Sequence, residues 1–296
     1  MPQDKKCAVF ILLGQSNAVG HGIPMKEEDR VTVPMKNVFG LSREANQSFD
    51  TDRLVWSGYT SGGMNLAETQ DHTYSVANCL AARWQAEIDR GNPSDLPDLY
   101  ILHIAIGAQG VTRRYLWHPE TERVLIPGEL GKVKISLFSF SEHIFSLLDR
   151  SFAEMGREYE VLGLHWRGGE NDIYAPMDTL AEELAAIYTT IFGRFSELLH
   201  TPPIVLHRLV CTDRMHDLDP TGEEQFFEKM QIINAEFDRL AACHANVSVF
   251  DTTCAPQYRE DVRGNGLFIE DNVHFTPEVN DFVAEKILSD FVKNRK

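Results

Sequence analysis

The sequence of 296 residues contains no long apolar run. A helix that spans a membrane needs about 20 consecutive apolar residues, and no stretch approaches that length. The apolar run at residues 8–13 follows two lysines, as the hydrophobic region of a signal peptide does. It is too short for such a peptide, however, and lacks a small-residue cleavage site. We therefore expect no membrane partner.

Cysteine is scarce and scattered. The five cysteines are odd in number and show no Cys-x-x-Cys spacing. This distribution is typical of free thiols in a reducing compartment and argues against a disulfide framework. We therefore expect a cytoplasmic protein. The cysteines are Cys7, Cys79, Cys211, Cys243 and Cys254.

Basic residues are few relative to acidic ones. The sequence has 28 lysines and arginines against 44 aspartates and glutamates, which gives a formal net charge of −16 at pH 7. Such a charge opposes binding to nucleic acid. The hydrophobic content of 43% and the charged content of 24% are those of a globular protein. We therefore expect no nucleic-acid partner.

Short apolar runs alternate with segments of helical periodicity. Apolar residues between the runs recur at steps of three and four, as from Phe226 to Leu240. Strands that alternate with helices form a parallel sheet covered on both faces. We predict an α/β fold, a three-layer α/β/α sandwich with a five-stranded parallel sheet, in a single domain over residues 1–296. The predicted strands are residues 8–13, 99–106, 161–166, 203–210 and 247–250.

Two long connections interrupt this alternation, at about residues 21–71 and 108–134. Connections of this length inside a compact domain are usually functional or disordered. Each leaves the carboxyl end of a strand, so we expect both to wall a pocket and to turn aromatic side chains toward it. The alternative is that these aromatics pack the loops onto the body of the protein. They are Trp56, Tyr59, Tyr115 and Trp117, with His118 beside them.

The first predicted strand ends abruptly in the tetrapeptide Gly-Gln-Ser-Asn at residues 14–17. Gly14 permits a tight turn, and Ser16 then lies at the carboxyl end of a strand, where open parallel sheets bind their ligands. A serine hydroxyl is a weak nucleophile until a base takes its proton. Ser16 is therefore a candidate nucleophile that needs a base. His21, just beyond the turn, is expected to be exposed; the alternative is that it faces the pocket.

Asp271 and His274 supply the base. One short turn can hold residues three apart in contact, so the carboxylate fixes the tautomer and orientation of the imidazole. A reaction at an acyl carbon also needs donors for the oxyanion of the tetrahedral intermediate. Gly107 and Asn171 follow the second and third predicted strands and share a sheet edge with Ser16. We predict a serine esterase with the triad Ser16, Asp271 and His274 and an oxyanion hole formed by the N–H of Ser16, the N–H of Gly107 and the amide of Asn171.

These blocks, taken in order, resemble those of the SGNH hydrolases. The nucleophile block matches residues 14–17, the second-block glycine matches Gly107, the Gly-x-Asn-Asp block matches residues 169–172, and the final Asp-x-x-His block matches residues 271–274. The resemblance implies a flavodoxin-like fold and catalysis without a metal or other cofactor. Gly-Gln-Ser-Asn is similar to the branch of sialate O-acetylesterases and acetylxylan esterases (carbohydrate esterase family 6).

One block departs from that branch. Its members usually read Gln-Gly-Glu-Ser-Asp, whereas residues 168–172 read Gly-Gly-Glu-Asn-Asp. A substrate contact made by the missing glutamine must come from elsewhere, and Arg167 and Gln109 are the candidates. Glu170 is a further candidate substrate contact, and Gln15 either touches substrate or shapes the nucleophile turn.

The function we expect is removal of O-acetyl groups from a carbohydrate, of sialic acid or xylan type, through an acetyl-enzyme on Ser16. The partner is then an acetylated carbohydrate or another small ester. Two alternatives stay open: a non-catalytic carbohydrate-binding protein, and a lipase or thioesterase that acts on longer acyl esters. An acidic loop lacks a recognised metal-ligand spacing and is interpreted as solvated. It contains Asp213, His216, Asp217 and Asp219.

Overall fold

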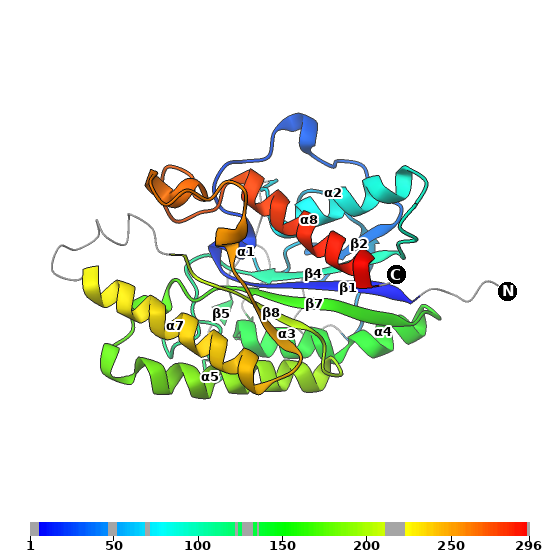
Figure 1. Cartoon of the computed structure of the whole chain (residues 1–296). Coiled ribbons are helices and arrows are strands. Elements are labelled where there is room, and N and C mark those ends of the chain that lie inside the picture. The colour runs from blue at the N-terminus through cyan, green and yellow to red at the C-terminus, as the bar shows by residue number, and fades with distance from the viewer. Residues whose placement is uncertain are drawn as a thin grey trace.

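The computed structural model describes residues 6–46, 52–68, 72–121, 124–125, 133–134, 136–210 and 223–294. A central sheet lies between two layers of helices (Figure 1). The predicted α/β class and its three layers are confirmed.

The described residues form a main sheet of seven strands in the order β3-β2-β4-β1-β7-β8-β9. All neighbours are parallel except β2 and β3, which are antiparallel. The five predicted strands are present as β1, β4, β7, β8 and β9. The strands are β1 (Cys7–Gly14), β2 (Val38–Leu41), β3 (Trp56–Gly58), β4 (Leu99–Ala105), β7 (Tyr159–Arg167), β8 (Ile204–His207) and β9 (Val247–Phe250).

The prediction of five strands was therefore wrong, because β2 and β3 lie inside the long connection at residues 21–71. Each contains a glycine, Gly40 in β2 and Gly58 in β3, so neither forms an uninterrupted apolar run in the sequence. What makes them strands is pairing: Val38 lies opposite Leu99 of β4, and Leu41 lies opposite Trp56. They extend the parallel sheet at one edge into a mixed one.

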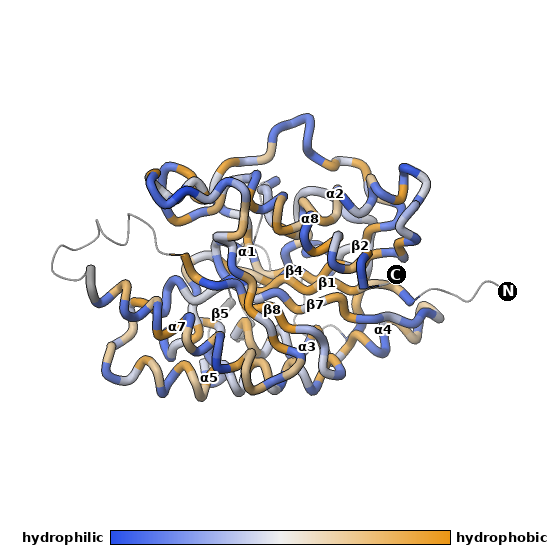
Figure 2. Tube along the Cα trace, viewed as in Figure 1, coloured by the Kyte–Doolittle hydropathy of each residue, from blue (hydrophilic) through white to orange (hydrophobic). Residues whose placement is uncertain are grey.

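The central strand β1 is buried along its whole length. Alternate side chains of a strand point to opposite faces of the sheet. Accordingly, Val9, Ile11 and Leu13 belong to one apolar core, whereas Phe10 and Leu12 belong to another. The strands form the orange centre of Figure 2, between helices in which blue and orange segments alternate.

The two cores are covered by different helices. The helices α2 and α8 pack on each other over one face, and α3, α4, α5 and α7 cover the other (Figure 1). Ser75 begins α2 and Ser136 begins α3, each accepting a hydrogen bond from the N–H three residues on. The helices are α2 (Val76–Asp89), α3 (Leu137–Ser146), α4 (Leu148–Glu154), α5 (Met177–Leu198), α7 (Glu223–Cys243) and α8 (Pro277–Asn294).

The shorter elements lie in the connections. None of the described helices combines the length and apolarity needed to cross a membrane. The short elements are α1 (Ser16–Val19), the paired strands β5 (Val124–Leu125) and β6 (Val133–Lys134), and the 3-10 helices Glu27–Asp29, Asp172–Tyr174, Thr252–Cys254 and Arg263–Gly266.

The aromatic side chains of the long connections pack on the body of the protein. Trp117 is fully buried against Trp166, and Tyr59 is buried with its hydroxyl donating to Asn78. Trp56 packs on Tyr100 of β4. For these three residues the alternative interpretation holds: their aromatic side chains pack the long connections onto the body of the protein.

Candidate active site

The turn after β1 is fixed by close contact with β7. Gly14 has φ of +140°, and a Cβ atom there would lie 2.0 Å from the carbonyl oxygen of Arg167. The same oxygen accepts a hydrogen bond of 3.0 Å from the N–H of Gln15. On the other side, the indole N–H of Trp117 donates to the Gly14 carbonyl at 3.0 Å. Only glycine allows this close approach of the two backbones. The turn therefore holds Ser16, two residues further on, in a defined place.

Ser16 is the first residue of α1 and lines a cavity of about 490 Å³. Its N–H has no acceptor within the helix because the first N–H groups of any helix lack one. The residue is 6% exposed, and the cavity reaches it from the carboxyl edge of the sheet. The cavity is also lined by His274, Gly107 and Asn171. The structure thus brings the predicted nucleophile, base and oxyanion donors to one place.

Asp271 holds His274 with both of its oxygen atoms. Its Oδ2 lies 2.5 Å from Nδ1 of His274, and its Oδ1 accepts hydrogen bonds of 2.8 and 2.9 Å from the N–H groups of Val273 and His274. Burial raises the pKa of this carboxyl, but the hydrogen bonds from the two N–H groups and the imidazole lower it more, so the pKa lies below its usual value. An ionised Asp271 places the hydrogen on Nδ1 and leaves Nε2 as the acceptor.

Asn17 joins the nucleophile turn to the histidine loop. Its Nδ2 donates to Oε1 of Glu170 at 2.8 Å and to the carbonyl of Val273 at 3.1 Å. Its Oδ1 accepts a hydrogen bond of 3.2 Å from the N–H of Phe275. Asn17 therefore binds the chain on both sides of His274 and fixes the position of His274 relative to Ser16.

The candidate oxyanion donors differ in their contacts. Asn171 lines the cavity, and no described residue hydrogen-bonds its side-chain amide; its carbonyl accepts from the hydroxyl of Tyr115 at 3.0 Å. The N–H of Gly107, by contrast, donates to Oε2 of Glu68 at 2.6 Å. Gly107 therefore lines the cavity, but its N–H already donates to Glu68.

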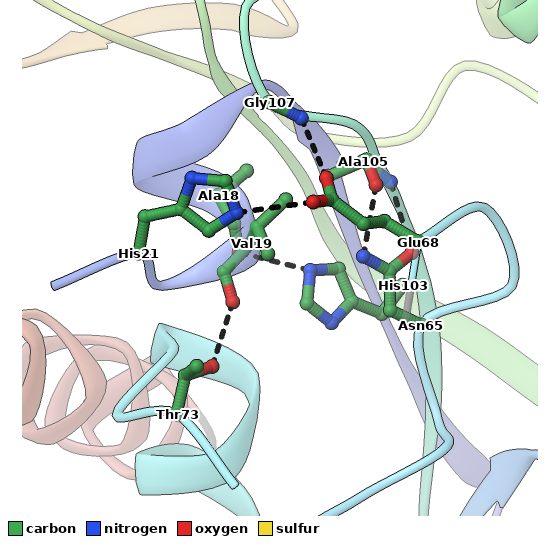
Figure 3. A network of polar contacts seen from close by, with 9 residues as sticks. All are labelled: Ala18, Val19, His21, Asn65, Glu68, Thr73, His103, Ala105 and Gly107. Carbon is green, nitrogen blue, oxygen red and sulfur yellow. Dashed lines mark hydrogen bonds and ion pairs between the residues drawn. The ribbon is translucent and has the colours of Figure 1, made fainter. Parts of the chain in front are cut away.

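His21 and Glu68 form a second histidine–carboxylate pair in the cavity (Figure 3). Nε2 of His21 lies 3.1 Å from Oε1 of Glu68, and its ring faces that of His274 edge-on at 5.6 Å between centroids. Of the two places considered for His21, the structure shows the one that faces the pocket, because its partly exposed side chain lines the cavity. Sequence reasoning missed Glu68, which belongs to no motif.

Arg167 supports the nucleophile turn from within the protein. It is 2% exposed, and its Nη1 donates to the carbonyl of Asn17 at 3.0 Å and to Oδ1 of Asn280 at 2.7 Å. Its guanidinium lies over the ring of Phe275 at 4.6 Å from the centroid. Burial lowers its pKa to about 10, so it stays charged at neutral pH.

The other candidate substrate contacts are placed differently. Gln15 and Glu170 line the cavity, as Arg167 does. Buried polar atoms with no described partner are found on all three: Oε1 of Gln15, Oε2 of Glu170, and Nε and Nη2 of Arg167. Gln109 is not among the described cavity residues; its Oε1 accepts from the N–H of Leu116 at 3.1 Å.

Asp172 fixes the loop that follows Gly107. It is fully buried and accepts hydrogen bonds of 2.9 to 3.1 Å from the N–H groups of Val111 and Thr112. Burial raises its pKa to about 6.

In the described part of the chain, no three histidine, cysteine, aspartate or glutamate side chains group as a metal site requires. The acidic loop from Asp213 to Asp219 lies outside the described residues.

Two solved structures align with nearly the whole chain. One is NanS, with a TM-score of 0.58 and 14% identity over 99% of this chain and 100% of that chain. The other is a protein from Arabidopsis thaliana, with a TM-score of 0.54 and 15% identity over 97% of this chain and 100% of that chain. No protein-family model and no curated protein matches the sequence. The likeness at these identities concerns the fold alone, and this chain shares the fold of these two structures.

Proposed function

We propose that this protein is a carboxylic ester hydrolase that uses Ser16 as its nucleophile. One observation carries the proposal: Ser16 and His274 line the same cavity, and Asp271 holds His274 at 2.5 Å with Nε2 left as the acceptor. A hydroxyl, an imidazole and an orienting carboxylate are the three groups that acyl transfer to serine requires.

The reaction proceeds in two halves. Nε2 of His274 takes the proton of Ser16 as its Oγ bonds to the acyl carbon, and the carbonyl oxygen becomes an oxyanion held by the N–H of Ser16 and the amide of Asn171. The intermediate expels the alcohol, which leaves with the proton from His274. Water then attacks the acyl-enzyme with the same base, which releases the acid and restores Ser16.

For the substrate we favour an O-acetylated carbohydrate, of sialic acid or xylan type. The volume of about 490 Å³ suits a small substrate. Unpartnered polar atoms of Gln15 and Glu170 offer hydrogen bonds to sugar hydroxyls. These observations support the choice made from the resemblance of the nucleophile block.

A lipase or thioesterase is the second candidate, because part of the cavity lining is apolar. The apolar lining residues include Ile173, Leu209, Val210 and Phe268. Side chains of this kind would favour an acyl chain longer than acetyl. Comparison of p-nitrophenyl acetate with p-nitrophenyl octanoate distinguishes the two: a higher kcat/KM for acetate supports the acetylesterase, and a higher value for octanoate supports the lipase.

The first test is Ser16→Ala with p-nitrophenyl acetate. We expect a loss of at least about 10³-fold in kcat, because the nucleophile is removed. Circular dichroism checks that the variant folds. Ser141→Ala is the matched control, since Ser141 is also buried, lies in α3 away from the cavity and has a hydroxyl without a described partner. Equal activity in wild type and Ser16→Ala, or none in either, contradicts the proposal and favours a carbohydrate-binding protein without catalysis.

A further inference from the structure

The segment that carries Glu68 is tied to the carboxyl end of β4 (Figure 3). The N–H of Leu66 donates to the carbonyl of His103 at 2.9 Å. The side chain of Asn65 both donates to the carbonyl of Ala105 at 2.8 Å and accepts from its N–H at 3.1 Å. These hydrogen bonds place Glu68 at the carboxyl edge of the sheet, beside the first residues after β4.

Glu68 uses its two oxygen atoms on two different donors of the cavity. Oε2 accepts from the N–H of Gly107 at 2.6 Å, and Oε1 lies 3.1 Å from Nε2 of His21. Because a carboxylate oxygen only accepts, Nε2 of His21 carries a hydrogen. Burial raises the pKa of Glu68, but these hydrogen bonds outweigh burial and lower it, so the group is ionised at neutral pH.

The absence of a side chain at Gly107 makes this contact possible. A Cβ atom there would lie 2.6 Å from Cε1 of His21. Glycine therefore lets the imidazole lie across the backbone and reach Glu68. An N–H and an imidazole N–H that converge on one carboxylate constitute a small-anion site, which in this structure the protein fills with its own side chain.

The same N–H is a candidate oxyanion donor. A donor in an oxyanion hole lies about 2.7–3.1 Å from the position that the oxyanion will occupy. Oε2 of Glu68 stands close to that distance from Gly107. An ester carbonyl that uses this N–H must therefore displace the carboxylate.

We propose that Glu68 is a displaceable internal ligand of the oxyanion site, which determines how strongly ester carbonyls and small carboxylates bind at Gly107. The role in turnover rests on the proposed esterase function, whereas the carboxylate site does not. While Glu68 occupies the donor, external carboxylates are excluded. When it is displaced, its bond to His21 keeps it within the cavity.

A binding experiment tests the site without turnover. Acetate is titrated into ¹⁵N-labelled wild type and Glu68→Ala, and the amide resonance of Gly107 is followed. We expect acetate to bind Glu68→Ala roughly 10- to 100-fold more tightly, which is the range that one charge-assisted hydrogen bond contributes. Glu68→Gln keeps the shape of the side chain without its charge and should fall between the two. It also serves if Glu68→Ala does not fold.

The matched control is Glu183→Ala. Oε1 of Glu183 also accepts a backbone N–H, that of Arg113 at 3.1 Å, but it lies outside the cavity. This variant should bind acetate as the wild type does. Equal acetate affinity in wild type, Glu68→Ala and Glu68→Gln, or a Gly107 resonance that does not move in any of them, overturns the proposal.

Turnover gives the second measurement. If Ser16 is the nucleophile, Glu68→Ala should hydrolyse p-nitrophenyl acetate with kcat/KM raised about 10-fold, because the carbonyl no longer competes for the Gly107 N–H. A folded Glu68→Ala variant with kcat/KM below that of wild type would contradict competition between Glu68 and the ester carbonyl for the Gly107 N–H. It would instead show that the reaction needs Glu68. If Ser16→Ala keeps full activity, the proposed function fails, and the acetate titration alone then decides the role of Glu68.

Discussion

At the scale of single residues, Asp271 has the contacts that best define its role. One oxygen orients the imidazole of His274 and the other accepts two backbone N–H groups of the same turn. The residue therefore both builds the turn and selects the tautomer. A substitution that preserves the first task and removes the second separates the two.

Asp271→Asn is such a substitution. Its Oδ1 can still accept the N–H groups of Val273 and His274, but an amide N–H₂ facing Nδ1 favours the opposite tautomer. We expect kcat for p-nitrophenyl acetate to fall by about 10⁴-fold, with a melting temperature within a few degrees of wild type. A variant that is equally stable and retains more than a tenth of the activity contradicts the assigned role of Asp271.

Residue types at fixed spacing were the part of the site that the sequence could predict. Ser16, His274 and Asn171 were found from short motifs and do line one cavity. The bridging contacts of Asn17 and the pairing of Glu68 with Gly107 were not predictable. Each joins segments far apart in the chain, and no local pattern records which side chains meet across the sheet edge.

At the scale of elements, the turn between β1 and α1 tolerates only glycine at position 14. Gly14 combines a positive φ with a backbone neighbour at a distance that no Cβ atom tolerates. Its partner is the backbone of Arg167, which cannot move aside without breaking the pairing of β1 with β7.

Gly14→Ala should therefore cost more than about 3 kcal/mol of unfolding free energy, or prevent folding. Gly156→Ala is the matched control, since Gly156 has φ of +66° but nothing within 4 Å of the added carbon. It should cost about 1–2 kcal/mol, the strain of the left-handed backbone alone. Urea denaturation of both variants measures the difference, and equal costs would show that the contact with Arg167 is unimportant.

The elements that the sequence revealed have an apolar run or an apolar stripe of their own. The stripe from Phe226 to Leu240 is the buried face of α7, and the run at residues 8–13 is the centre of β1. The short strands β2 and β3 escaped because they are formed by pairing with β4 and with each other, and not by their own residue pattern.

At the scale of the whole molecule, three buried histidines make stability depend on pH. Burial lowers the pKa of His103 to about 4 and that of His165 to about 3, and it lowers the pKa of His207 well below its usual value. His165 and His207 are hydrogen-bonded to each other at 3.0 Å between ring nitrogens. All three are neutral in the folded protein at pH 5, whereas most of the unfolded chain's histidines are charged there.

Between pH about 6.5 and 4 the unfolded state therefore binds more protons, and the free energy of unfolding falls as the pH falls. Asp172 acts in the opposite direction, because its raised pKa of about 6 lets the folded state bind a proton first. With three groups against one, we expect a net loss of about 2–3 kcal/mol per pH unit near pH 5. Urea denaturation from pH 7.5 to 4.5 measures it, and a flat profile would contradict the neutral histidines.

The position of β1 in the sheet has a consequence for synthesis. It pairs with β4 on one side and β7 on the other, and both are made later. At about 5–20 residues per second, the ribosome needs roughly 7–30 s to complete β7 after β1 has been made. β1 has neither neighbour until β4 has been made and lacks one neighbour until β7 has been made, so one of its edges is open to pairing with other chains throughout. Newly made protein thus passes through an interval in which β1 has an unpaired edge, and it leaves that interval only when the segment that also carries Arg167 has been made.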